Sequence, residues 1–153
     1  MYLKEINLSR VKDGIKIEIA EIVLGIDKGK HEAVLDNYDH YSFIKFPHNR
    51  KSVKITNNGD ISAYDYNRLE PIHVKNQAEA YHLLAETQWI SFDKELPELE
   101  QEIIVKAYDN FITRAILEQN EGQQYETIFC LGEEISVSTN EFVGWLPAEN
   151  VVS

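Results

Sequence analysis

Three adjacent segments decide the fold class of this chain: Val53-Lys54-Ile55, Asn57-Asn58-Gly59-Asp60 and Ile61-Ser62-Ala63-Tyr64. The first and the last of these segments alternate apolar and polar residues, which is typical of strands with one buried face. An Asn-Gly pair between two such segments is the strongest short signal of a β-hairpin, because both turn residues tolerate a positive φ. We therefore predict an antiparallel sheet in the first half of the chain.

Outward from this hairpin, residues 42–46 predict a further strand, which Pro47 ends. Residues 15–26 are open to two interpretations. Their apolar members are Ile15, Ile17, Ile19, Ile22, Val23 and Ile26. The first three alternate with Lys16 and Glu18, as in a strand, whereas the whole set also fits one face of a helix.

Residues 76–86 carry the clearest helical pattern. Asn76 is a suitable N-cap, and Glu79 stands at the capping-box position three residues later. The apolar face consists of Ala80, Tyr81, Leu83 and Leu84. This helix would join the two halves of the chain.

The second half predicts mainly strands, with Asp109-Asn110 as a tight turn between the first two of them. The predicted strands are residues 102–108, 111–117, 124–131, 135–137 and 142–145. The expected fold class is therefore α+β, with mainly antiparallel strands, one or two helices and a central helix near residues 76–86.

Charge divides the chain in two. Residues 1–80 carry 12 Lys and Arg and 12 Asp and Glu, whereas residues 81–153 carry 3 and 14, so that the net charge of −11 lies in the second part. We expect a charge-balanced α+β half over residues 1–85 and an acidic, mainly-β module over residues 86–153, packed as one compact unit. A chain this acidic repels nucleic acid, so direct nucleic-acid binding is not expected.

Two further features of the sequence indicate the cellular compartment of the protein. No apolar run approaches the roughly 20 residues of a membrane span, and charged residues interrupt any signal-like start. The single cysteine, Cys130, excludes an internal disulfide and fits a reducing compartment. We expect a cytoplasmic protein without a membrane partner.

Short motifs bracket the acidic half. They are Trp89-Ile90-Ser91-Phe92, Leu96-Pro97-Glu98, Glu102-Ile103-Ile104-Val105 and Trp145-Leu146-Pro147. We expect Trp89 and Trp145 to be buried in one cluster, with Leu96, Pro97 and Pro147 also in structural roles, because indoles bury large apolar areas.

In these motifs, residues 88–149 resemble the phage and bacterial domain-of-unknown-function family numbered 551. That family opens with Trp-Ile-x-Val, continues through Leu-Pro and a valine-rich strand, and closes with Trp-Met-Pro-Leu-Pro. Phe92 stands in place of its Val, and Ala148-Glu149 in place of its second Leu-Pro. The resemblance implies a phage- or prophage-associated setting and brings no catalytic residues.

The concentrated basic stretch around Arg50, Lys51 and Lys54 is a candidate ligand site. Arg50 offers a bidentate fork to a phosphate, and Tyr41 and Tyr64 could stack on a base. The plainer interpretation is a solvated loop. A homo-oligomer could supply a second basic wall.

Acidic side chains form a second candidate site, for a protein partner, at Glu98, Glu100, Glu102 and Glu133. The same carboxylates could instead imitate a row of nucleic-acid phosphates, or serve solubility alone.

Catalytic patterns are not evident. His31, Asp36, Asp39, His40 and His48 match no zinc spacing, Cys130 lies in an apolar run among glutamates, and the glycines form no phosphate loop. We expect no enzyme, no metal site and no cofactor. The first hypothesis is a non-enzymatic phage- or mobile-element-type binding protein acting on a host or phage partner. One alternative is a sponge that sequesters a small anionic nucleotide signal as an anti-defence protein, and a second is an acidic nucleic-acid mimic.

Overall fold

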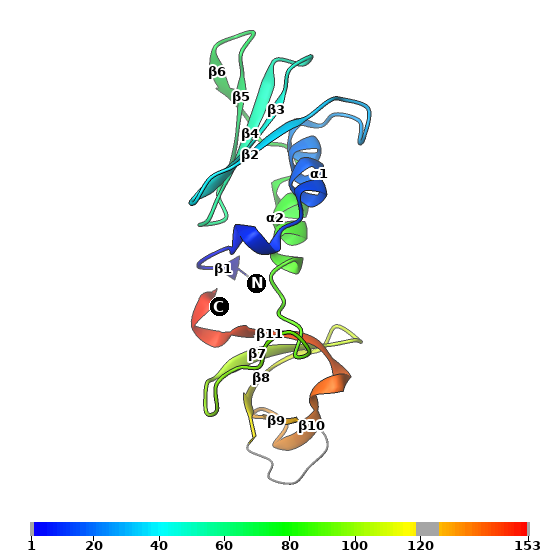
Figure 1. Cartoon of the computed structure of the whole chain (residues 1–153), viewed down its shortest axis with the longest axis vertical. Coiled ribbons are helices and arrows are strands. Elements are labelled where there is room, and N and C mark those ends of the chain that lie inside the picture. The colour runs from blue at the N-terminus through cyan, green and yellow to red at the C-terminus, as the bar shows by residue number, and fades with distance from the viewer. Residues whose placement is uncertain (1, 119–125, 153) are drawn as a thin grey trace. The chain divides into compact units, whose positions relative to one another are not determined.

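A five-stranded antiparallel sheet forms around the hairpin predicted at Asn58-Gly59 (Figure 1). The structure is a computed structural model that describes residues 2–118 and 126–152. It divides into an N-terminal unit, Leu3–Gln88, and a C-terminal unit, which comprises Tyr2 and the described residues from Trp89 onward. Two α-helices and three antiparallel sheets confirm the predicted α+β class.

The sheet of the N-terminal unit is a meander in which each strand pairs with the next along the chain. Its strands are β2 (Val34–Asn37), β3 (Tyr41–Phe46), β4 (Lys51–Thr56), β5 (Ile61–Asp65) and β6 (Glu70–Ile72). The predicted hairpin is β4–β5, and the strand predicted at residues 42–46 is β3.

The β4–β5 turn has one detail that differs from the prediction. The Gly59 N–H donates to the Thr56 carbonyl (3.0 Å), and of the Asn58-Gly59 pair only Gly59 has a positive φ, 82°. This is a three-residue loop that needs the left-handed conformation at a single position. Asn110, with φ 71°, takes the equivalent place in the loop predicted at Asp109-Asn110.

Residues 15–24 are helical, so the strand interpretation of residues 15–26 is wrong. α1 (Asp13–Leu24) buries residues spaced three and four apart, namely Lys16, Ile19, Ala20, Val23 and Leu24. That spacing places them on one helical face, which lies against β3 and β4. Gly25, with φ 68°, ends the helix in the left-handed conformation that glycine tolerates.

The predicted helix at residues 76–86 is α2 (Gln77–Glu86), which packs beside α1 within the N-terminal unit (Figure 1). The predicted capping box is wrong. Asn76 has φ 49°, and its side chain accepts no capping hydrogen bond. Its amide instead donates to the Ile22 carbonyl of α1 at 3.4 Å.

A polar network links α1 to β2 and β3, with Lys16 and Ser42 buried and Asp13 and Asn37 exposed. The Lys16 ammonium donates to Asn37 Oδ1 (2.7 Å), which also accepts from the Ser42 hydroxyl (2.8 Å). Asn37 Nδ2 donates in turn to Asp13 (3.2 Å). Burial lowers the pKa of the Lys16 ammonium, and the Asp13 carboxylate opposes that shift in part.

This lowered pKa predicts a pH dependence of stability. Where the unfolded chain holds a proton that the folded chain releases, stability rises with pH. The penalty of burying the Lys16 charge is therefore present in full below the folded-state pKa and is relieved as pH rises toward 10.5. We expect wild type to gain stability relative to Lys16→Met between pH 7 and 10, measured by urea unfolding. A difference that does not change with pH would contradict the desolvation of this ammonium.

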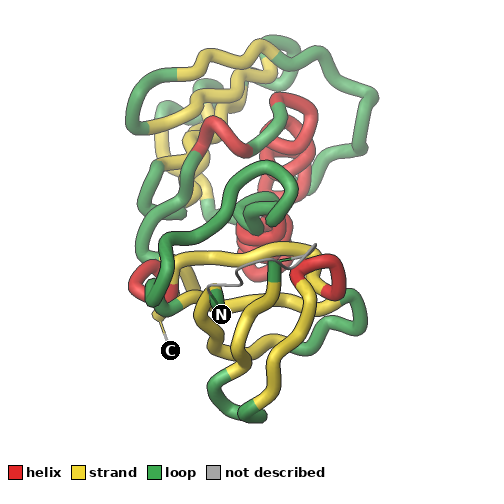
Figure 2. Tube along the Cα trace, turned by 60° about the horizontal axis from the view of Figure 1, so that its bottom comes forward, coloured by secondary structure: helices red, strands yellow, loops and turns green. Residues whose placement is uncertain are grey.

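The C-terminal unit contains the second five-stranded antiparallel sheet, in the order β10-β9-β8-β7-β11. Its strands are β7 (Ile103–Ala107), β8 (Ile112–Leu117), β9 (Thr127–Cys130), β10 (Ile135–Ser138) and β11 (Phe142–Pro147). They confirm the strands predicted after residue 102, although residues 124–125 of one prediction lie outside the described residues. The sheet is curved (Figure 2).

Short elements complete the fold. A third sheet pairs β12 (Val151–Val152) with β1 (Tyr2–Leu3), whose Tyr2 belongs to the C-terminal unit. The 3₁₀ turns are η1 (Leu8–Arg10), η2 (Thr139–Glu141) and η3 (Ala148–Asn150). In the described part of the chain, neither α-helix is long and apolar enough to cross a bilayer.

The core of the C-terminal unit confirms the prediction for one Trp and not for the other. Trp145 is 4% exposed, belongs to the buried cluster and donates from Nε1 to the Glu95 carbonyl (2.9 Å). Trp89 is half-buried and lies outside that cluster, with the Lys106 ammonium 5.8 Å from its ring. Its neighbour Ile90 forms an isolated bridge with Trp145 and belongs to the cluster, whereas the Trp89 side chain does not.

The predicted structural residues around these Trp differ in burial. Pro97 is buried and Pro147 is half-buried. Leu96 is 44% exposed, so its predicted core role is wrong. Leu96 precedes β7 in a segment outside any strand, where no neighbouring ladder holds its side chain inward.

Candidate functional site

The two faces of the N-terminal sheet differ sharply in composition. Strand register places Ile44, Val53 and Ala63 side by side on the face that α1 covers. It places Phe43, Lys54 and Ser62 side by side on the opposite face. We call this second face the open face, because α1 packs on the other one.

Aromatic rings and lysines alternate on the open face. The Lys54 ammonium lies 4.5 Å from the Tyr41 ring centroid, and the Lys45 ammonium lies 5.4 Å from that of Phe43. Both distances are within the range of cation–π attraction, which holds a cation close to an aromatic surface.

Tyr64 and Tyr66 extend this surface across β5. Their ring centroids are 4.9 Å apart in an edge-to-face arrangement, and Tyr66 Oη accepts from the buried Ser52 hydroxyl at 3.3 Å. These contacts restrain Tyr66 beside Tyr64 on the open face. Rings held in this way can receive a flat ligand without a further loss of side-chain freedom.

The open face carries a shallow hollow of about 470 Å³. This volume lies within the range of roughly 300–1,000 Å³ that is typical of small-molecule sites. Its walls are mainly aromatic, from Phe43, Tyr64 and Tyr66, with Leu69 at one side. Lys54 supplies a positive charge, and Ser62 supplies a hydroxyl. The arrangement suits a ligand with a planar apolar part and a negative charge.

The structure brings together some of the ligand residues predicted from the sequence. Tyr41, Lys54 and Tyr64 share the open face. Lys51 does not, because it pairs in register with Phe46 and Asp65, on the side of the sheet that α1 covers. Arg50 lies in the β3–β4 turn with φ 52°, outside the strands.

Sequence reasoning missed Tyr66 and Ser62 as members of this surface. For Ser62 the signal was available, since it stands two residues from Tyr64 on a predicted strand and therefore faces the same way. Tyr66 comes after β5 ends at Asp65, where alternation no longer predicts direction.

The acidic residues predicted for a protein partner do not form one surface. Glu102 forms an ion pair with Arg114 (2.7 Å), and Glu133 accepts a hydrogen bond from the Thr113 hydroxyl (2.9 Å). Arg114 and Thr113 are neighbours on β8, so their side chains point to opposite faces of the sheet. Glu98 and Glu100 are exposed in the segment before β7.

This separation also bears on nucleic-acid mimicry, which needs an ordered row of carboxylates. Because Glu102 and Glu133 are held on opposite faces, the two cannot belong to one such row.

Groups for catalysis or metal binding are sparse. In residues 2–118 and 126–152, no three His, Cys, Asp or Glu side chains lie together in a way that could hold a metal ion. Burial, and then the nearby Glu133 carboxylate, raise the pKa of the Cys130 thiol. A raised pKa disfavours the thiolate, which is the nucleophilic form.

Comparisons of the chain with protein-family models, with curated proteins and with solved structures found no match. The resemblance of residues 88–149 to the family numbered 551 therefore stays a prediction.

Proposed function

We propose that this protein is a non-enzymatic binding protein whose open face binds a small anionic ligand with a planar aromatic ring, of the nucleotide class. The observation that carries the proposal is the aromatic hollow of about 470 Å³ with Lys54 in its wall. It favours the nucleotide hypothesis over the acidic-patch hypothesis, whose residues Glu102 and Glu133 are held apart.

Both parts of such a ligand have a counterpart on the open face. Stacking of a base on an aromatic side chain contributes about 1–3 kcal/mol and tolerates any base, because every base has a π-face. Tyr64 and Phe43 provide such surfaces, and Lys54 provides a point charge for a phosphate.

Charge balance allows an anion to approach. Residues 1–80 carry no net charge, so the repulsion expected of the whole chain does not originate around this face. In the phage or mobile-element setting that the resemblance implies, the ligand would be a nucleotide signal that the protein sequesters.

Tyr64→Ala tests the stacking surface. Isothermal titration with adenosine 5′-monophosphate at low salt should show affinity that falls about tenfold, since a lost stacking contact of about 1.4 kcal/mol corresponds to that factor. Lys54→Ala should lower the affinity for the monophosphate and leave the affinity for adenosine unchanged, because only the monophosphate carries the negative charge that Lys54 contacts.

Lys30→Ala is the matched control, because this substitution removes the same charge as Lys54→Ala. Lys30 is exposed in the segment between α1 and β2. It should leave binding within about twofold of wild type. Mass spectrometry of freshly purified, denatured protein adds a second measurement. An empty protein that also shows no heat with any of the four nucleoside monophosphates would overturn the proposal.

A further inference from the structure

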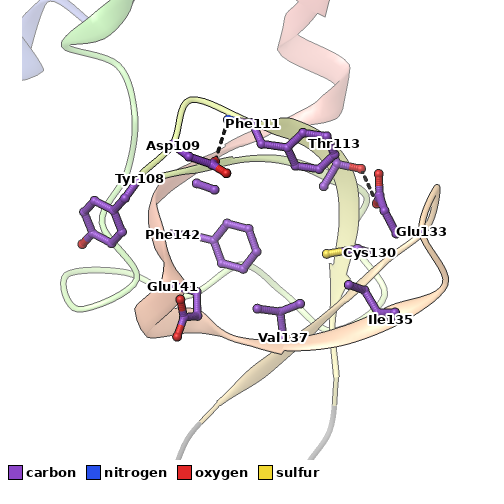
Figure 3. Close-up of a pocket in the computed structure, with 11 residues that line it drawn as sticks. Tyr108, Asp109, Phe111, Thr113, Cys130, Glu133, Ile135, Val137, Glu141 and Phe142 are labelled. Carbon is purple, nitrogen blue, oxygen red and sulfur yellow. Dashed lines mark hydrogen bonds between the residues drawn. The ribbon is translucent and has the colours of Figure 1, made fainter.

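A second hollow, of about 370 Å³, lies in the C-terminal unit (Figure 3). It is formed by the β7–β8 turn, the β9–β10 turn and the start of β11. β10 and β11 are at the two ends of the strand order, and residues of both line it, namely Val137 and Phe142. The curvature of the sheet thus creates the hollow.

The floor of the hollow is apolar. Phe142 lies at its centre in Figure 3, with Val137 and Cys130 beside it. Phe142 is 7% exposed and Cys130 is 3% exposed, so both belong to the core of the unit. The Cys130 thiol is free and points into the hollow, which leaves a buried weak donor available to an occupant.

Carboxylates surround this floor on three sides. Glu133 is held by the Thr113 hydroxyl, and Asp109 accepts from the Phe111 N–H at 3.0 Å. Glu141 comes from η2, immediately before β11. Figure 3 shows these three side chains at separate places around the Phe142 ring.

Positive charge is missing from the lining, all of which belongs to the described residues: it includes no Lys, Arg or His. The surrounding half adds to the effect, because residues 81–153 carry 3 Lys and Arg against 14 Asp and Glu. An apolar floor with an acidic rim is complementary to a cation on an apolar stem. The lining also includes the rings of Phe142 and Phe111, and the face of an aromatic ring attracts a cation through its quadrupole.

We propose that this hollow is a docking site for a Lys or Arg side chain of a partner protein. Both side chains carry a positive head on an apolar stem that can lie along apolar surface. The volume is at the small end of ligand pockets, as a single side chain requires.

The rim indicates that the cation arrives on a polypeptide. Tyr108 is 72% exposed, Ile135 is 52% exposed and Phe111 is 49% exposed, and all three border the hollow. Exposed apolar residues around a filled pocket are where the residues flanking an anchor side chain make contact. A free small amine would leave this apolar rim unused.

This site is independent of the proposed nucleotide surface, since no residue belongs to both. It also revises the residues expected to meet a protein partner. Glu133 remains among them, and Asp109 and Glu141 take the place of Glu98, Glu100 and Glu102.

Two blocked peptides provide the test, Ser-Leu-Arg-Leu-Ser and the same peptide with norleucine in place of Arg, titrated into the full chain at low salt. Amide shifts of Thr113, Cys130 and Phe142 report occupancy by NMR. We expect the Arg peptide to bind about tenfold or more tightly than the norleucine peptide, because norleucine keeps the stem and lacks the charge. Equal binding of the two would overturn the proposal.

Glu141→Lys places a competing charge at the rim and should weaken the Arg peptide about tenfold or more. Glu98→Lys is the matched control, with the same change in net charge at an exposed residue outside the hollow. It should change affinity by less than about threefold, the scale of a screened surface charge. An equal loss of peptide affinity in the two variants would show that only general charge attraction is involved, and it would overturn the proposal.

n-Butylammonium tests whether a free amine is sufficient. If it binds as tightly as the Arg peptide does, the proposal that the cation belongs to a polypeptide is overturned. Lys54→Ala should leave the peptide affinity unchanged, so failure here and failure of the nucleotide surface are distinguishable.

Discussion

Trp145→Ala should lower the free energy of unfolding by about 3–5 kcal/mol, the usual loss for a large aromatic removed from a core. Trp145 is 4% exposed and packs within the same cluster as Ile90 and Val105. The substitution also removes the Nε1 hydrogen bond to the Glu95 carbonyl, which ties the segment before β7 to β11. Urea unfolding, followed by far-ultraviolet circular dichroism, measures the change.

Trp89→Ala is the matched control. Trp89 is half-buried and outside the buried cluster, so its removal should cost less than half as much. A loss below about 1 kcal/mol for Trp145→Ala would contradict its core role and favour an exposed binding anchor instead.

Gly144→Ala should cost about 2–3 kcal/mol although it adds one methyl group, because overpacking of a close backbone approach forces the chain apart. A Cβ at Gly144 would lie 2.5 Å from the Ile90 carbonyl oxygen, which is a backbone atom and cannot swing away. Ile90 and Trp145 exchange both backbone hydrogen bonds at 2.9 Å, so the added methyl group would push this bridge open.

Gly132→Ala controls for the general effect of replacing glycine in the same unit. A Cβ there would have its nearest neighbour at 3.7 Å, the Thr113 hydroxyl, which is ordinary contact. Its unfolding free energy should stay within about 1 kcal/mol of wild type. If Gly144→Ala is equally mild, the segment carrying Ile90 is free to move away from β11.

Sequence patterns predicted most elements of this fold because their signals are local. The hairpin at Asn58-Gly59 and the helix at residues 76–86 each depend on residues within a few positions of one another. The sequence left two interpretations of residues 15–26, because the spacing of their apolar residues fits both a strand and a helix. The packing of the Lys16–Leu24 face on β3 and β4 decides for the helix. Size and hydrophobicity predicted the core position of Trp145 correctly, but the same argument failed for Trp89.

The candidate sites were less predictable, because they depend on which strands are neighbours. Lys51 and Lys54 are an exception, because they stand three residues apart on one strand and alternation alone places them on opposite faces. By contrast, the hollow at Cys130 combines β7, β9 and β11, whose order in the sheet differs from their order in the chain. No local pattern reports that order.

Strand order also has a consequence for how each sheet assembles. In the N-terminal sheet every strand pairs with its neighbour in the chain, so the sheet can grow hairpin by hairpin with short loops closed at each step. In the C-terminal sheet, β11 must return past β8, β9 and β10 to pair with β7. That step closes a long loop, from Ala107 to Phe142, and the entropy of closure is lost before the pairing compensates for it. We therefore expect the pairing of β11 with β7, which brings Gly144 and Trp145 into place, to form later than the hairpins of the same sheet.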